Sequence, residues 1–257
     1  MSKEQIRKFG YKLGADAVGF AAIEDYKSEK AADPRTILPD VKSLVVFGYR
    51  ELDGPLKSSN CRAGFSSRMG LMDLSAKNNY LMTRYIEDNF KVKAAFIPVS
   101  YPLDMGAEVM GLVGDVSLRH AAIAAGLGVF GRHNLVIHPK FGTRIIFTAI
   151  LTELELESDR PIEKELCTQC GLCVENCPSH ALDEEGKTDM LKCLKESQPY
   201  GIGGAIRFWR QFGSSSPEEQ KELLKEPRFL TLYQAQFMGF QYFCFNCLAV
   251  CPACLDL

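Results

Sequence analysis

Short apolar runs separated by polar segments recur through the first 160 residues of the chain. Runs of this length that are rich in β-branched residues are typical of buried strands. Two apolar segments, 135–138 and 143–154, flank a turn at 139–142 and predict a hairpin or adjacent strands. The other expected strands lie at about 17–23, 41–49 and 92–99.

Helical periodicity fills the intervals between these runs. The pattern predicts a helix near the N-terminus that ends at Gly14 and a second helix at about 71–90. Asp115 is placed to cap a helix that runs through Ala125. Together with the strands, these helices predict a mixed fold, α+β (α/β), for residues 1–160.

A stretch of about fifty residues, 194–243, separates two groups of cysteines. Within it, the glycines of 201–204 predict a flexible connection, and Ser216-Pro217-Glu218-Glu219 predicts the capped start of a helix. Aromatic residues in this stretch are expected to pack on the core as part of an insertion, or alternatively to line a pocket. They are Phe208, Trp209 and Phe212.

Composition and charge set the first limits on which functions are possible. The 257 residues are 46% hydrophobic and 24% charged, which allows one large domain or two modest ones. The segment up to Arg160 has 21 basic and 19 acidic residues. Of the 30 basic and 32 acidic residues in the whole chain, the remaining 9 and 13 follow Arg160. Proteins that bind nucleic acid through its phosphates usually concentrate basic residues. We therefore expect no DNA partner, and the charge disfavours tRNA.

The chain carries no sign of a membrane or an exported protein. No apolar run approaches the ~20 residues of a membrane span, and the first residues match neither a signal peptide nor a twin-arginine leader. The expectation is a cytoplasmic protein. Nine of the ten cysteines follow Leu166, and only Cys61 precedes it. Because such a protein has no secretory reason for disulfides, this cluster indicates metal ligation.

The cysteine spacing is that of a bacterial ferredoxin. The run Cys167-x2-Cys170-x2-Cys173-x3-Cys177-Pro178 uses three cysteines for one 4Fe–4S cluster and sends the fourth to a second cluster. A second group, Cys244-x2-Cys247-x3-Cys251-Pro252, also ends in Cys-Pro but is one ligand short. Cys193 supplies the missing ligand.

The pseudo-symmetry of two-cluster ferredoxins, if it holds here, assigns the ligands. Each Cys-Pro cysteine then crosses to the other cluster. Zinc is the alternative metal, because paired Cys-x2-Cys is common in zinc sites, but eight ligands in crossed sets favour iron–sulfur. The predicted ligands are Cys167, Cys170, Cys173 and Cys251 for the first cluster and Cys177, Cys193, Cys244 and Cys247 for the second, with Cys254 left over.

The cysteine layout and the segment before it resemble the epoxyqueuosine reductase and reductive dehalogenase superfamily. Gly131-Arg132-His133 is more similar to the dehalogenases, whereas the step from Cys177 to Cys193 is more similar to the queuosine enzymes. The chain ends just past its last cysteine, so it resembles a short form without C-terminal helical repeats. The matching residues are 125–139 (AGLGVFGRHNLVIHP), 141–144 (FGTR) and 150–156 (ILTELEL).

The resemblance implies a nitroreductase-like core that holds cobalamin in its base-off form, followed by a ferredoxin-like domain with two 4Fe–4S clusters. It implies a domain of residues 1–160 and a second of 161–257, with an insertion at about 194–243. A flavin in the same pocket is the alternative cofactor, because the core resembles nitroreductases. The candidates for the loop that faces the cobalamin are Arg132, His133 and Asn134.

One departure from the queuosine enzymes concerns the catalytic acid. Those enzymes are expected to use an acidic residue at a position where ungapped alignment places Leu112, while Asp104 and Asp115 lie out of register. This departure disfavours epoxyqueuosine reduction. Tyr101 is a candidate proton donor of the dehalogenase kind.

The resulting hypothesis is an oxygen-sensitive, cobalamin-dependent reductase. Electrons from a low-potential donor such as ferredoxin or flavodoxin would pass through the two clusters to cobalamin, which would act on a small-molecule substrate. One alternative is a non-catalytic electron-transfer protein that serves a partner or the corrinoid of another protein. A second alternative is an epoxyqueuosine reductase.

Overall fold

The computed structural model describes residues 2–97, 106, 111–238 and 242–253. Its main sheet has four strands in the order β1-β2-β6-β3, and neighbouring strands are antiparallel. The strand expectations for 17–23, 41–49, 92–99 and 143–154 are confirmed, and so is the mixed helix and sheet fold. The strands are β1 (Ala17–Ala22), β2 (Ser43–Arg50), β3 (Ala94–Phe96) and β6 (Ile145–Thr152).

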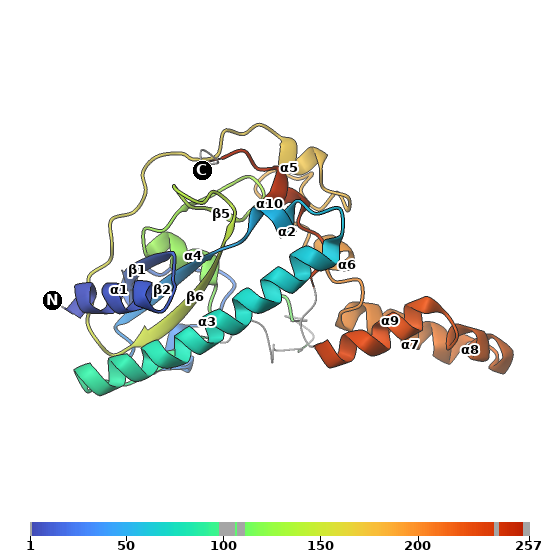
Figure 1. Cartoon of the computed structure of the whole chain (residues 1–257), viewed down its shortest axis with the longest axis horizontal. Helices are drawn as coiled ribbons and strands as arrows, with labels where there is room; N and C mark the ends of the chain where they lie inside the picture. The colour runs from blue at the N-terminus through green and yellow to red at the C-terminus, as the bar shows by residue number, and fades with distance from the viewer. Residues whose placement is uncertain (1, 98–105, 107–110, 239–241, 254–257) are drawn as a thin grey trace.

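Helices cover both faces of this sheet (Figure 1). α1 (Ser2–Lys12) and α3 (Cys61–Phe90) pack on one face, in a cluster that includes Phe20 and Ile86. α4 (Leu118–Ala124) packs on the other face. β2 and β6 are buried along almost their whole length, which explains why their sequences are continuously apolar.

Short elements connect these layers. The hairpin or adjacent strands expected for 135–138 and 143–154 are not formed, because one bridge from His138 to Gly142 closes the turn and the two strands then enter different sheets. A turn signal in the sequence specifies a chain reversal but not the partner of each strand. The connecting elements are η1 (Ile23–Asp25), η2 (Pro34–Thr36), α2 (Asp53–Leu56), and the paired strands β4 (Val129–Phe130) and β5 (Val136–Ile137).

α3 begins at Cys61 rather than at about residue 71. The Asn60 side chain caps it by accepting a hydrogen bond from a backbone amide of the first turn. The extra turns pack on C-terminal residues, since Phe65 stacks on Phe243 with ring centroids 5.5 Å apart. This partner is distant in sequence, so the local apolar pattern gives no sign of it.

The C-terminal part has short helices beside the core and a group of helices that extends away from it (Figure 1). We define residues 202–238 as the arm. The helices beside the core are α5 (Leu172–Glu175), α6 (Met190–Ser197) and α10 (Asn246–Val250), and those of the arm are α7 (Ile202–Ser214), α8 (Pro217–Leu223) and α9 (Pro227–Met238). The expected helix after Ser216 is confirmed with its full capping box.

Two expectations for the arm are corrected. Residues 201–204 are not a flexible connection, because Gly204 is buried in α7 where a Cβ would lie 2.0 Å from the carbonyl oxygen of Pro199. The aromatic residues pack within the arm rather than on the core, as Phe208 shows by stacking on Phe229 with centroids 5.4 Å apart. Trp209 lines a pocket with both rings and remains 50% exposed.

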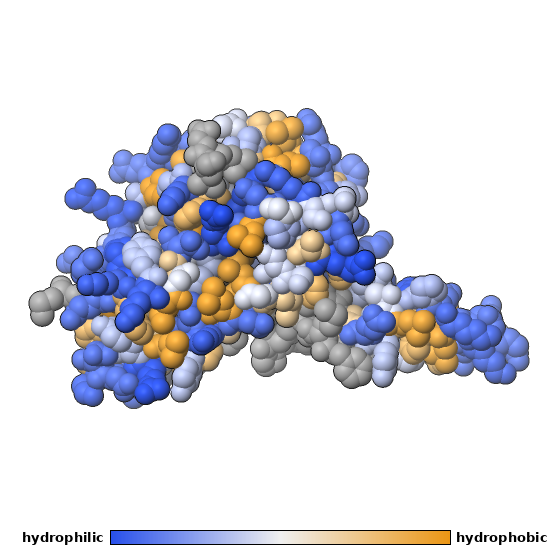
Figure 2. Space-filling model, viewed as in Figure 1, coloured by the Kyte–Doolittle hydropathy of each residue, from blue (hydrophilic) through white to orange (hydrophobic). Residues whose placement is uncertain are grey.

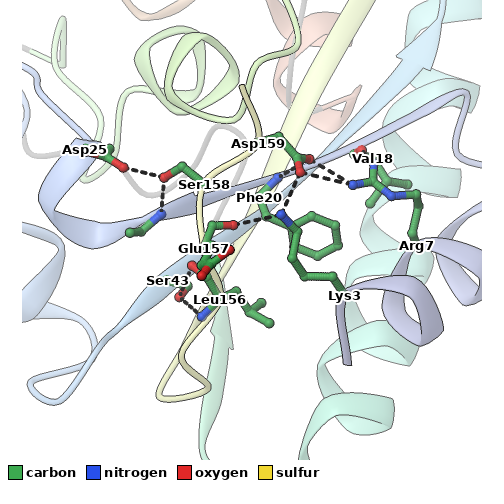
Figure 3. A network of polar contacts seen from close by, with 11 residues as sticks. Lys3, Arg7, Val18, Phe20, Asp25, Ser43, Leu156, Glu157, Ser158 and Asp159 are labelled. Atoms are coloured by element: carbon green, nitrogen blue, oxygen red, sulfur yellow. Dashed lines mark hydrogen bonds and ion pairs between the residues drawn. The ribbon is translucent and has the colours of Figure 1, made fainter. Parts of the chain in front are cut away.

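Residues 153–160 connect β6 to the cysteine-rich part, and we call them the connecting segment. They run along the outer edge of β1, where the Asp159 amide donates to the Phe20 carbonyl (2.8 Å). The Asp159 carboxylate forms ion pairs with Lys3 (2.7 Å) and Arg7 (2.9 Å) of α1 (Figure 3). These contacts cover an otherwise open sheet edge and fix the start of the cysteine-rich part against the core.

Polar and charged residues dominate the visible surface, with apolar residues exposed on both the body and the arm (Figure 2). On the arm the exposed apolar side chains include Ile206 and Leu230. Across the described parts of the chain, no helix is both long enough and apolar enough to cross a membrane.

Candidate metal centres and their surroundings

Four cysteines from both ends of the C-terminal part line one pocket. They are Cys167, Cys170, Cys173 and Cys251, which we call the first thiol set. Left-handed backbone at Gln169 (φ 54°) and Gly171 (φ 78°) turns the chain sharply between the first three cysteines. Burial raises the pKa of Cys173, and the three other thiols of the set raise it further.

A second group of four cysteines gathers beside α5. It contains Cys177, Cys193, Cys244 and Cys247, which we call the second thiol set. Burial raises the pKa of Cys247 to about 12, and the three other thiols of this set add to the shift. α6 carries Cys193 and α10 carries Cys247. The Asn246 side chain donates to the Asn176 carbonyl (3.2 Å) and so links α10 to the end of α5.

The two thiol sets have the donor chemistry of iron–sulfur ligands. Every cysteine in the described part of the chain is a free thiol. Buried thiols that repel one another when ionised are stabilised when a metal centre replaces their protons. Two backbone amides already point at sulfur, from Arg132 to Cys167 (3.5 Å) and from Ala181 to Cys177 (3.3 Å). Among the described residues, no three His, Cys, Asp or Glu side chains are grouped closely enough to hold a single metal ion.

The loop predicted to face cobalamin lies at the first thiol set. Arg132 and His133 line the same pocket as the four thiols, and the Arg132 guanidinium pairs with Glu185 (3.3 Å). Asn134 has left-handed backbone (φ 59°), and its carbonyl accepts a hydrogen bond from Arg119 (2.6 Å). Their contact with cobalamin stays a prediction.

His133 is the most enclosed member of this loop, with 4% of its surface exposed. Its Nδ1 accepts a hydrogen bond from the Leu135 amide (3.1 Å). Its Nε2 has no hydrogen-bond partner among the described residues. Burial lowers the pKa of His133 to about 4, so the imidazole is neutral near neutral pH.

Sequence reasoning missed an arginine that joins the core to residues 249–251, next to a cysteine of the first thiol set. Arg144 is 1% exposed, and its Nε donates to Asp53 (2.7 Å). Its two other nitrogens donate to the carbonyls of Ala249 (2.9 Å) and Cys251 (3.3 Å). Arg144 therefore holds the chain at the Cys251-Pro252 corner. Its place within the matched FGTR segment was the available signal.

A second ionic group lies next to the second thiol set, and the sequence analysis missed it too. The Arg68 Nε donates to the Glu51 carboxylate (2.6 Å), and the guanidinium lies 4.7 Å from the ring centroids of both Tyr242 and Phe245. Glu51 is 4% exposed, and burial raises its pKa although Arg68 and Arg144 act to lower it. A charged residue directly after a buried strand was the signal that marked Glu51.

The described residues supply no catalytic acid at the expected place. Leu112 is half-buried, and Asp115 is exposed and precedes Ser117, which is the N-cap residue of α4. Tyr101, Asp104 and Cys254 lie outside the described residues. The roles predicted for Tyr101 and Cys254 stay predictions.

Comparisons with known proteins agree with this architecture. Residues 160–183 match the 4Fe-4S binding domain family. Epoxyqueuosine reductase from Staphylococcus aureus is 28% identical over 217 residues, covering 75% of this chain and 55% of that protein. The Bacillus cereus epoxyqueuosine reductase is 24% identical over 276 residues, covering 97% and 64%. The chain thus spans between about half and two-thirds of the length of these relatives.

Solved structures share the fold. Epoxyqueuosine reductase with an epoxyqueuosine-modified tRNA-Tyr stem loop superimposes with a TM-score of 0.62 at 19% identity, covering 98% of this chain and 64% of that one. The catabolic reductive dehalogenase NpRdhA superimposes with a TM-score of 0.59 at 23% identity, covering 76% and 29%. Fold and matched segment together define an iron–sulfur protein with a mixed helix and sheet core. The chain is thus similar in sequence to epoxyqueuosine reductases, and it shares its fold with them and with reductive dehalogenases.

These matches confirm one expectation and correct another. 4Fe–4S clusters and cobalamin are confirmed as the cofactors that the superfamily uses. The expectation of a small-molecule substrate, with tRNA disfavoured, is wrong, because the relatives are epoxyqueuosine reductases and one of them is solved with a tRNA stem loop. The physical reason is that charge totals average over the whole chain and do not report local basic surfaces.

Proposed function

We propose that this chain is an iron–sulfur reductase of the epoxyqueuosine reductase kind that acts on a modified nucleoside in tRNA. The observation that carries the proposal is the shared fold, over 98% of the chain, with a reductase solved with an epoxyqueuosine-modified stem loop. The match to the 4Fe-4S binding domain family at residues 160–183 adds the electron-transfer chemistry.

The ligands in this proposal are the two thiol sets, one for each 4Fe–4S cluster. Electrons from a low-potential donor such as ferredoxin or flavodoxin enter at the second set and pass to the first. Two observations support this route. The first set includes Cys251, which Arg144 holds against the core. The two sets are also neighbours, because the Cys173 thiol contributes to the raised pKa of Cys247.

Cobalamin, when bound, supplies the reductive chemistry on the substrate. The role of the protein is to hold and orient the cofactor, to exclude water and to deliver a proton. Arg132, His133 and Asn134 stay the candidates for the cofactor-facing loop. Their position at the first thiol set supports a cofactor site within reach of that cluster.

The test is an anaerobic assay of the whole chain carrying both clusters and cobalamin, with a chemical reductant and epoxyqueuosine-containing tRNA. We expect queuosine in the digested tRNA, detected by mass spectrometry. Cys173→Ala should abolish the conversion, whereas Cys61→Ala, at an exposed cysteine outside both sets, should not. No conversion by protein with full iron and cobalamin content would reject the proposal and favour the electron-transfer alternative.

A further inference from the structure

The protonation pattern of His133 is fixed by its surroundings. The Leu135 amide donates to Nδ1 at 3.1 Å, and a ring nitrogen that accepts a hydrogen bond carries no proton. The proton of the neutral imidazole therefore lies on Nε2. Nε2 is thus a hydrogen-bond donor by geometry alone.

This donor is buried and lacks an acceptor among the described residues. A buried donor without a partner loses its hydrogen bonds to water and gains none in return, so native proteins rarely leave one unsatisfied. His133 lines the pocket that holds the first thiol set, so the acceptor for its Nε2–H is expected in that pocket. The four thiols there are Cys167, Cys170, Cys173 and Cys251.

The packing around His133 holds the ring in this orientation. A Cβ on Gly131 would lie 2.5 Å from the ring carbon Cε1 and 2.9 Å from Nε2, so the ring lies directly against the glycine backbone. The Asn134 amide donates to the Gly131 carbonyl (2.8 Å) and closes the turn that carries the ring. The same turn directs the Arg132 amide at the Cys167 sulfur (3.5 Å).

We infer that His133 donates an Nε2–H hydrogen bond to a sulfur atom of the iron–sulfur cluster held by the first thiol set, and that this bond raises the reduction potential of that cluster. The inference rests on the ligand set in the proposed function. Reduction adds negative charge to the cluster, so a donor directed at its sulfur stabilises the reduced form. His133 would adjust the reduction potential of the cluster through this hydrogen bond and would not be a cluster ligand.

The experiment is an anaerobic potentiometric titration of the holoprotein, followed by electron paramagnetic resonance. In His133→Phe, which keeps a ring but removes the donor, the midpoint potential of the first cluster should fall while that of the second does not change. His133→Gln, which retains an N–H donor, should restore part of the shift. His120→Phe makes the same change at a histidine that lines neither thiol set, and it should leave both potentials unchanged.

A second measurement uses the wild-type protein and does not depend on the folding of a variant. With 15N-histidine, pulsed resonance of the reduced first cluster should show a weak histidine nitrogen coupling. Absence of this coupling, or an unchanged potential in His133→Phe with full iron and sulfide, would overturn the inference. A strong coupling would overturn it as well, because it would make the imidazole a ligand. Iron and sulfide content tests the ligand set itself. Failure of the ligand assignment is therefore distinguishable from failure of the hydrogen-bond inference.

Discussion

Arg144 shows how one buried side chain links two parts of the molecule. It comes from the start of β6, yet two of its hydrogen bonds reach carbonyls of the Ala249–Cys251 corner. A guanidinium in this position is satisfied only when the sheet, α2 and that corner are all in place, because Asp53 of α2 accepts the third bond. The arginine therefore couples folding of the core to the position of a proposed cluster ligand.

Arg144→Met should lower the free energy of unfolding by about 1–3 kcal/mol, because the carbonyls of Ala249 and Cys251 lose their donor and the half-exposed Asp53 loses an ion pair. Chemical denaturation of the anaerobic protein, followed by circular dichroism, measures the loss. Arg84→Met is the matched control at an exposed pair with Asp88 (3.5 Å), where the change should stay below about 1 kcal/mol. Equal losses in the two variants would contradict the linking role of Arg144.

Cys193 tests the ligand assignment, because it is the predicted ligand farthest from either cysteine run. Anaerobic protein should carry about eight iron and eight sulfide per chain, and Cys193→Ala should lose roughly half of both. Iron and sulfide analysis measures this, and Cys61→Ala should keep the full content. Stoichiometric zinc without sulfide would end the iron–sulfur assignment. Cluster loss in Cys254→Ala but not in Cys193→Ala would reassign the ligand.

At the scale of elements, local signals in the sequence were sufficient where the element is decided locally. The Ser216 capping box specifies the start of α8 within its own first turn, and the apolar run of 41–49 specifies a buried strand. The early turns of α3 depend on Phe243, and strand β5 depends on β4. Such partners lie outside any local window, so periodicity cannot reveal them.

The connecting segment is an element held by close packing. Gly126 has left-handed backbone (φ 67°), and a Cβ there would lie 2.4 Å from the Arg160 carbonyl oxygen. Gly126→Ala should therefore displace the segment and speed hydrogen exchange at the Phe20 and Ala22 amides, which donate to Asp159 and Ser158 side chains. Mass spectrometry of exchange measures this.

Gly14→Ala is the matched control for the connecting segment. Gly14 is also left-handed (φ 99°), but its Cβ position has no neighbour within 4 Å. The substitution adds backbone strain of the same kind without a steric contact. It should leave exchange at Phe20 and Ala22 unchanged, and the same acceleration in both variants would show that strain alone is responsible.

For the whole molecule, the sequence was sufficient to predict the iron–sulfur character and the fold class but not the substrate. Cysteine spacing is a local pattern with a direct chemical meaning. It was therefore sufficient to predict the 4Fe-4S binding domain that the family match places at residues 160–183. Substrate binding depends on how surface charges gather in three dimensions, which totals of 21 and 19 cannot express. The domain division at residue 160 stays a prediction.

The arm has a small hydrophobic core of its own, with Phe208 completely buried at its centre. Trp209, the one tryptophan of the chain, lies beside it. Tryptophan fluorescence should therefore follow unfolding of the arm, and Phe208→Ala should lower that unfolding free energy by about 3–5 kcal/mol. Iron content should stay unchanged. Leu224→Ala, at an arm residue that is 39% exposed, is the control and should cost less than Phe208→Ala. A coupled loss of iron in Phe208→Ala would mean that the arm is not independent.

The proposed ligand sets interleave along the chain, because Cys251 completes the first and Cys177 belongs to the second. On a ribosome, the early cysteines emerge long before Cys247 and Cys251 do. A nascent chain therefore cannot complete either cluster until residues 244–251 have been synthesised. A chain cut short before Cys247 and Cys251 would lack a ligand in both sets, so truncation there would remove both clusters together rather than one.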